Sequence, residues 1–276
     1  MSIRRAAVAG SWYAGEAAAL TRDVVRYLEA ADVPPLSGRL VALISPHAGL
    51  LYSGPVAAYA YKTLAARPPS TALLVGPSHR AAFEGIALYA DGAFETPLGR
   101  APVDAPLAAH LAAADPLIAK AEAPHRDEHS LEMQLPFLQH VAPRAAIVPM
   151  LMGTQSAEEI EALALALADA ARGRDDVVLV ASSDLSHYHP APVANRMDAL
   201  VVDDVARFDA AALQDRLERS HEHACGGGPM VAVMKAARAL GATRSVVLRY
   251  ADSGDAGPCD KSRVVGYLAA AFTAPS

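Results

Sequence analysis

Three short apolar segments, each typical of a buried strand, run within a few residues into a histidine. The segments are 40–45, 72–75 and 177–181, and the histidines are His47, His79 and His187, in that order. Neutral imidazole is the commonest metal ligand in proteins. Ligands of open α/β sheets bind outside the carboxyl ends of the strands, so we expect the three side chains to converge. The alternative is a set of hydrogen-bonded loop histidines.

Residues 127–132 form a second polar cluster, in which His129 and Glu132 are three positions apart. On a helix this spacing places both side chains on one face. The pair could supply metal ligands, or His129 could transfer protons while Glu132 orients it. In a third interpretation Asp127 caps a helix and the cluster is a solvated first turn. The spacing leaves all three open.

Cys225 precedes three glycines and Pro229, which opens a helical segment. A helix N-terminus at this point would lower the pKa of the thiol and favour the thiolate. A thiolate binds soft or borderline metals or acts as a nucleophile, whereas a buried cysteine is inert. The glycines could also form an anion-binding nest, but the Lys-Ser/Thr of a P-loop is missing.

The other histidines and the second cysteine carry less weight. His110 and His140 lie in helical segments and are expected to be structural or exposed, and His125 and His189 are weaker loop candidates. Cys259 lies in a polar loop and receives no role. Two cysteines cannot form a disulfide framework for a chain of this length.

The periodicity of apolar residues predicts the elements that must position these side chains. Helices are predicted over 16–30, 54–66, 104–114, 129–140, 192–207, 209–219 and 229–241, with a further helix after the Ser156–Glu159 capping box. Strands are predicted over 40–45, 72–75, 86–89, 145–152, 177–181, 246–250 and 264–268. Continuously apolar strands are buried on both faces. The sequence therefore predicts an α/β fold, an open, mostly parallel or mixed sheet with helices on both faces.

Composition narrows the function classes. The chain has 276 residues, a net charge of −6, and 53% hydrophobic and 20% charged residues, with no segment typical of a linker, so we expect one domain spanning 1–276. Basic residues are scattered singly, which argues against nucleic acid and anionic membrane surfaces. The apolar runs are too short to span a membrane. Gly10, Ser11 and Gly15 interrupt any signal-peptide core, so we expect a cytoplasmic protein.

Several motifs in a fixed order make a specific resemblance. They are Arg5-Ala6 with Gly10-Ser11-Trp12-Tyr13, Pro46-His47-Ala48-Gly49 with Tyr52-Ser53-Gly54, Gly76-Pro77-Ser78-His79, Asp127-Glu128-His129-Ser130-Leu131-Glu132 with Gln134-Leu135-Pro136-Phe137, Ser182-Ser183-Asp184 with His187, and Cys225-Gly226. Over nearly its whole length the chain resembles the Memo family, called AmmeMemoRadiSam system protein B in prokaryotes. A single Memo-like domain, 1–276, is implied.

The resemblance implies a fold similar to the class III extradiol dioxygenases, in which two histidines and a glutamate hold Fe(II). In Memo-like proteins the positions of His47 and His79 are kept and a cysteine, here Cys225, takes the third place. The implied cofactor is a divalent metal, with Fe(II) expected and copper or zinc as alternatives. His187 falls where the dioxygenases carry an acid–base histidine.

These implications complete the expected site. His187 and His129 would move protons, with Asp184 setting a tautomer, and Trp12, Tyr52 and Glu132 would face the substrate. A thiolate in place of the carboxylate softens the site and argues against catechol cleavage. Leu50 stands where the family usually has an aromatic residue, which alters one wall of the pocket.

Two function classes follow. The first is a metal-dependent oxidative enzyme related to non-haem iron dioxygenases. The second is a non-catalytic binding or scaffold subunit that recognises a small molecule or peptide and works with radical-SAM system proteins. A zinc hydrolase is a third alternative, because Zn²⁺ lowers the pKa of a bound water to about 7.

Overall fold

The computed structural model describes residues 2–255 and 260–275. Its helices are α1 (Ala17–Ala30), α2 (Leu50–Lys62), α3 (Ala105–Ala114), α4 (Leu135–Val141), α5 (Ala157–Ala170), α6 (Ala191–Ala206), α7 (Ala210–Arg219) and α8 (Gly227–Ala239). Its strands are β1 (Ile3–Arg4), β2 (Arg39–Ser45), β3 (Thr71–Pro77), β4 (Ile86–Leu88), β5 (Ala93–Thr96), β6 (Gly99–Pro102), β7 (Ile118–Lys120), β8 (Ala146–Met152), β9 (Val177–Ser182), β10 (Asp184–His189), β11 (Arg244–Asp252) and β12 (Val264–Ala274).

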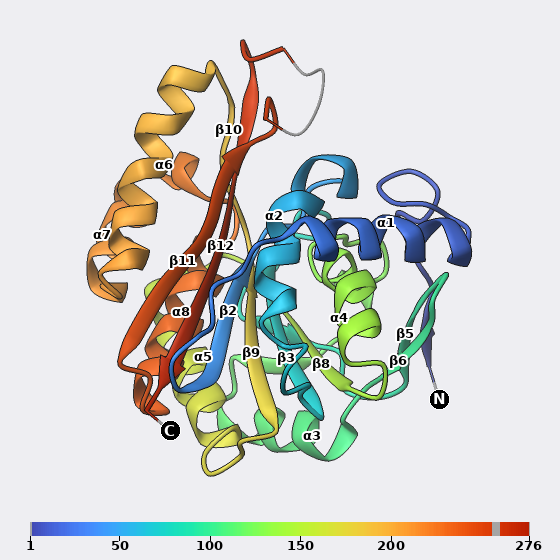
Figure 1. Ribbon diagram of the computed structural model, residues 1–276. Helices are drawn as coiled ribbons and strands as arrows, with labels where there is room; N and C mark the ends of the chain where they lie inside the picture. Colours follow the sequence, from blue (N-terminus) through green and yellow to red (C-terminus); the bar gives the residue numbers. More distant parts are fainter. Residues whose placement is uncertain (1, 256–259, 276) are drawn as a thin grey trace.

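A large mixed sheet forms the centre of the molecule (Figure 1). Its strand order is β10-β12-β2-β9-β3-β8-β4-β7, and β11 also pairs with β12. The four central strands β2, β9, β3 and β8 are parallel, whereas β12 runs antiparallel to β2 at one flank and β4 runs antiparallel to β8 at the other. Parallel pairing brings the carboxyl ends of β2, β9 and β3 to one edge, which is where the candidate residues begin.

Helices cover both faces of this sheet, as the sequence predicts (Figure 1). Alternate residues of β3 enter different cores: Leu73 and Val75 pack with α3 and α5–α8, and Leu74 packs with α1, α2 and α4. Both cores are apolar, which explains why the central strands read as unbroken apolar runs. The predicted fold class is confirmed.

Local signals fix several helix starts. Ser156 and Glu159 form the predicted capping box of α5, each side chain pairing with the other residue's backbone N–H. Asp104 caps α3 by accepting from the backbone N–H of Leu107 at 3.1 Å. These caps satisfy backbone donors that a helix leaves unpaired at its N-terminus.

The structure differs from the predicted elements at two places that matter for the site. The segment predicted as one helix over 129–140 begins as a loop, makes a 3-10 turn over Glu132–Gln134 and becomes helical at Leu135. In addition, His187 lies on β10 rather than in a loop, because the chain re-enters the sheet two residues after β9. Cys259 lies outside the described residues.

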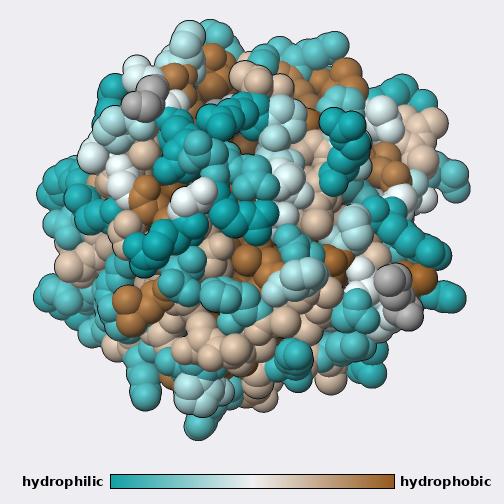
Figure 2. Space-filling model, turned by 90° about the horizontal axis from the view of Figure 1, so that it is seen from below, coloured by the Kyte–Doolittle hydropathy of each residue, from teal (hydrophilic) through white to brown (hydrophobic). Residues whose placement is uncertain are grey.

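No helix among the described residues has the length and apolar character needed to cross a membrane. Figure 2 views the molecule from below, where teal hydrophilic side chains are interspersed with small separate apolar areas.

Candidate metal centre

His47 is held in one tautomer by the hydroxyl group of Ser182, which donates its only proton to another residue. The Ser182 Oγ donates its single proton to the carbonyl of Ser130 at 2.6 Å and accepts from the Gln134 amide at 2.7 Å. The Nδ1 of His47 lies 2.8 Å from the same oxygen, so this nitrogen must be the donor. The proton is therefore on Nδ1, and the Nε2 lone pair of His47 is available to a ligand.

His79 is fixed in the same way by a carboxylate. Its Nδ1 lies 2.9 Å from Glu128 Oε1, and an ionised carboxylate can only accept. Burial alone would raise the pKa of Glu128, but the hydrogen bond and charge of His79 and the backbone N–H groups of His79 and Ser130 hold this pKa well below its ordinary value. His79 thus carries its proton on Nδ1 and keeps Nε2 free.

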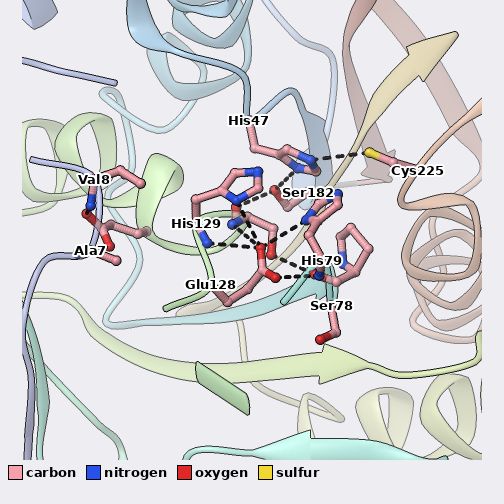
Figure 3. Close-up of polar contacts among 12 residues, drawn as sticks. Ala7, Val8, His47, Ser78, His79, Glu128, His129, Ser182 and Cys225 are labelled. Carbon is pink, nitrogen blue, oxygen red and sulfur yellow. Dashed lines mark hydrogen bonds and ion pairs between the residues drawn. The ribbon is translucent and has the colours of Figure 1, made fainter. Parts of the chain in front are cut away.

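The ligand atoms of three histidines lie within 4.8 Å of one another: His47, His79 and His129 (Figure 3). The backbone N–H of His129 donates to Glu128 Oε1 at 2.9 Å, and Trp12 packs over its ring with centroids 4.3 Å apart. The Nδ1 of His129 is buried without a hydrogen bond and lies 3.3 Å from Glu128 Oε1. This nitrogen, next to two imidazoles whose Nε2 atoms are free, gives an arrangement that a bound cation would satisfy.

Cys225, the predicted third ligand, is not part of this group of three and contacts it through His47. Its Sγ lies 3.2 Å from His47 Nε2, the nitrogen that the Ser182 hydrogen bond leaves free (Figure 3). Tetrahedral bonding with a metal–sulfur length of about 2.3 Å and a metal–nitrogen length of about 2.0 Å would put these atoms about 3.5 Å apart. The donors His47 and Cys225 therefore fit a shared ion with little movement.

Burial, reinforced by the negative charge of Asp184, raises the pKa of the Cys225 thiol above its ordinary value. The expectation that a helix N-terminus lowers this pKa is wrong, because burial and the charge of Asp184 outweigh the effect of the α8 N-terminus, which begins two residues after the thiol. In the protein alone the sulfur is a neutral thiol that donates to His47. A bound cation would displace this proton.

Burial keeps the imidazoles of His47, His129 and His187 uncharged at neutral pH. Burial, together with the proximity of the other histidines, lowers the pKa of His47 well below its ordinary value. Burial lowers the pKa of His129 to about 4 and also lowers that of His187. Neutral imidazole is the form that binds metal.

Asp184 and His187 lie beside the cluster in roles different from the expected pair. Asp184 accepts from the backbone N–H groups of His47 at 2.7 Å and Ala48 at 3.3 Å, so it fixes the loop after β2. Burial raises the pKa of Asp184 to about 7. The tautomer of His187 is set by the carbonyl of Leu185, which lies 2.7 Å from its Nδ1. The expected Asp184–His187 orientation pair is replaced by these two separate contacts.

Glu132 is committed to the N-terminal segment of the chain. It forms a buried ion pair with Arg4, accepts from Tyr13 Oη, and accepts from the backbone N–H of Ala7 at 2.8 Å and of Val8 at 3.1 Å. Arg4 also donates to the backbone carbonyls of His125 and Glu128. The expectation that Glu132 faces the substrate or orients His129 is therefore wrong, since its oxygens are used to clamp residues 4–13 against the 125–132 loop.

A hollow of about 720 Å³ opens beside the cluster. Trp12 and Tyr52, both expected to face the substrate, contribute to its wall together with Tyr188 and Arg263. Trp12 links the hollow to the histidines because its other side packs on His129. The arrangement offers a chamber lined by aromatic rings, Arg263 and Asp260, close to three imidazoles and a thiol.

Sequence reasoning missed three residues that support the site. Glu128 was part of a recognised motif, but the helical spacing argument drew attention to Glu132 instead. Ser182 directly follows the strand predicted over 177–181, and this position is the feature of the sequence that could have identified it as a site residue. Arg4 is 4% exposed, and no spacing in the sequence relates it to a partner 128 residues away.

Comparisons with known proteins agree with the motifs. The family described as Memo-like protein matches residues 4–271. A MEMO1 family protein of Methanothermobacter thermautotrophicus is 39% identical over 274 residues, covering 96% of this chain and 98% of the relative. One from Methanopyrus kandleri is 35% identical over 280 residues, covering 98% of each chain. Among solved structures, an uncharacterized protein from Escherichia coli K12 has a TM-score of 0.58 and 17% identity, covering 84% of this chain and 99% of that one, which shows a shared fold.

Because Glu132 holds residues 4–13 against the 125–132 loop, we expect Glu132→Gln to lower the free energy of unfolding. The substitution leaves the buried Arg4 guanidinium without its counter-charge, and breaking a buried pair costs about 3–5 kcal/mol. Denaturant unfolding should show a loss of this size, whereas Glu122→Gln, an exposed glutamate that bonds Ser2 Oγ, should unfold like the parent. An unchanged free energy of unfolding in Glu132→Gln would contradict this structural role and make Glu132 a candidate substrate contact again.

From the lowered pKa of buried His125 we expect the protein to lose stability in mild acid. Burial lowers the pKa of His125 from 6.5 to about 4, and its Nε2 lies 2.9 Å from the carbonyl of Ala87. Between these pKa values the unfolded chain binds a proton that the folded chain does not, so stability falls as the pH drops from 6.5 to 4.

His125→Gln keeps a donor for Ala87 and removes the titrating group. We expect its unfolding free energy to match the parent at pH 7 and to exceed it at pH 4 by up to about 3 kcal/mol. Chemical unfolding at several pH values measures this difference. His110→Gln, at an exposed histidine paired with Asp169, should follow the parent, and parallel curves for parent and His125→Gln would contradict the assignment.

Proposed function

We propose that this protein, which belongs to the Memo-like family, binds one divalent metal ion through His47, His79 and Cys225 and is a metal-dependent oxidative enzyme. The observation that carries the proposal is the pair of fixed tautomers. Ser182 and Glu128 hold the Nδ1 protons of His47 and His79, so both Nε2 lone pairs are free, and a ligand nitrogen of one ring lies within 4.8 Å of one on the other. Hydrogen bonds of this kind to the remote ring nitrogen are typical of metal-ligating histidines.

The donor set narrows the choice of ion. Two imidazoles and one thiolate suit iron, copper and zinc, whereas magnesium and calcium prefer oxygen ligands. We propose Fe(II), in keeping with the likeness to non-haem iron dioxygenases, and the metal analysis below distinguishes it from copper and zinc. When bound, a redox-active ion supplies the electron transfer that none of the surrounding side chains provides.

The residues of the chain supply binding and proton transfer. Trp12, Tyr52 and Arg263 hold the substrate in the hollow, where the guanidinium binds an anionic group and the rings cover apolar surface. His129 is uncharged and lies between Trp12 and His79, so its free nitrogen accepts a proton from the substrate. His187, with its Nδ1 proton fixed by Leu185, offers a second acceptor.

Metal analysis tests the proposal. Anaerobically purified protein should contain about one equivalent of metal per chain by mass spectrometry, and His47→Ala, which removes the imidazole at the centre of the cluster, should contain almost none. Cys225→Ser should weaken binding by at least about tenfold, because an alcohol does not replace a thiolate as a soft ligand. His110→Ala serves as the control histidine.

Two outcomes would change the conclusion. Unchanged metal content in both His47→Ala and Cys225→Ser ends the proposal. If His129→Ala loses its metal while Cys225→Ser keeps it, the ligands are the three histidines and the thiol is a neighbour of the site.

Binding without turnover is the second candidate function, and the hollow is large enough for it. About 720 Å³ accommodates a small molecule or a short peptide segment whether or not a reaction follows. Such a protein would serve as a scaffold or substrate-handling subunit beside radical-SAM system proteins. A ligand or partner that binds equally well after loss of Cys225 and His187 supports this function over the oxidative one.

A further inference from the structure

Gln155 adopts an unusual backbone conformation in the turn between β8 and α5. Its φ is +57°, in the left-handed region that residues other than glycine rarely adopt. Strained conformations of this kind persist only where surrounding interactions hold them, and they concentrate at functional sites. The contacts of Gln155 show what holds it.

The side-chain amide of Gln155 grips the turn that carries Cys225. Its Nε2 donates to the carbonyl of Cys225 at 2.9 Å, and its Oε1 accepts from the backbone N–H of Gly228 at 2.8 Å. One planar amide therefore uses both of its polar ends on residues three positions apart. Two such contacts fix the orientation of the turn as well as its distance.

The opposite side of the same turn rests on the strand ends. The backbone N–H of Cys225 donates to the carbonyl of Asp184 at 3.2 Å, and that of Gly226 donates to Ser183 Oγ at 3.0 Å. A Cβ on Gly226 would lie 2.4 Å from the carbonyl oxygen of Ser182, so the packing there is close. The turn is thus held between the ends of β9 and β10 on one side and Gln155 on the other.

Gln155 is itself anchored to the loop that follows His79. Glu159, 3% exposed, accepts from the backbone N–H of Gln155 at 2.7 Å with one oxygen and from that of Gly85 at 2.6 Å with the other. The carboxylate therefore ties the β8–α5 turn to the segment that connects β3 with β4. The position of the thiol is connected in this way to the loop of a predicted histidine ligand.

We infer that Gln155 is a positioning residue for Cys225, holding its sulfur against His47 Nε2 so that the thiol is pre-arranged for metal binding. The inference deepens the proposed function and rests on it in treating Cys225 as a ligand. Gln155 would not touch the ion. It acts through the backbone of the turn, in the way that groups outside a metal's ligand sphere orient the ligands within it.

Gln155→Asn separates positioning from stability. Asparagine tolerates the left-handed conformation better than glutamine does, so the turn keeps its shape. Its amide is one methylene shorter and cannot reach both Cys225 and Gly228. Gln155→Gly is a second variant, relaxed at this φ and without any amide.

Thiol alkylation in metal-free protein gives the first measurement. The variants are made on a Cys259→Ala background so that iodoacetamide reports on Cys225 alone. Losing the two hydrogen bonds should raise the alkylation rate about tenfold in both Gln155 variants, with the thermal midpoint of Gln155→Asn close to the parent's. Gln214→Asn is the matched control, since Gln214 lines, with Gln155 and Cys225, a hollow of about 300 Å³ but donates its side-chain amide to Glu218.

Cobalt binding gives the second measurement and separates the two claims. In the parent, Co²⁺ should produce a thiolate-to-cobalt charge-transfer band, and in Gln155→Asn the affinity should fall about 10- to 100-fold. Alkylation rates within twofold of the parent in both Gln155 variants would overturn the positioning role, whatever cobalt does. A parent that shows no such band would contradict Cys225 as a ligand, while faster alkylation in the variants would still establish that Gln155 positions the thiol.

Discussion

The candidate centre depends on where two protons sit. Both His47 and His79 carry their proton on Nδ1 because Ser182 and Glu128 can only accept there. If the Ser182 hydroxyl had no other acceptor, it could donate to His47 and the free nitrogen would point the wrong way. The Ser130 carbonyl and the Gln134 amide prevent this by using the remaining capacity of that hydroxyl. The tautomer of one ring is therefore decided by a carbonyl and an amide that never touch it.

The sheet explains why such a network can form from distant parts of the chain. Ser182 ends β9, and β9 lies between β2, which leads to His47, and β3, which leads to His79. Parallel pairing aligns the three carboxyl ends, and Ser45 lies opposite Ser182 in the register. The loop of Glu128 and Ser130 then crosses this edge and is held there by Arg4 and Glu132 from the far side. The strands fix the histidine backbones, and the loop fixes the side-chain orientation.

Strand-level reasoning recovered the convergence of His47 and His79, because it needs only apolar runs and the rule that parallel strands end together. It could not recover Glu128, since the argument from spacing assumed a helix at 129–132, whereas the helix begins at Leu135. The prediction of a lowered pKa for the Cys225 thiol is wrong for a related reason. The sequence shows that Cys225 lies close to a glycine-rich helix start. The burial of the thiol and its proximity to the charge of Asp184, however, depend on tertiary packing. Local patterns predicted that His47 and His79 gather, whereas the addition of His129 to them and the protonation of the cluster depend on long-range contacts.

Charge balance connects these protonation states to metal binding. The imidazoles of His47 and His129 are neutral, Glu128 is ionised at the edge of the cluster, and the thiol keeps its proton while the protein is alone. In the proposed centre a bound divalent cation would displace that proton, and the thiolate and Glu128 would together match its two charges when Asp184, whose pKa burial raises to about 7, is protonated. Glu132 does not take part because Arg4 already neutralises it. An uncompensated charge in a buried site is strongly destabilising. A thiol at this position can stay neutral without the ion and become a thiolate when the ion binds, so that with ionised Glu128 it balances a divalent charge.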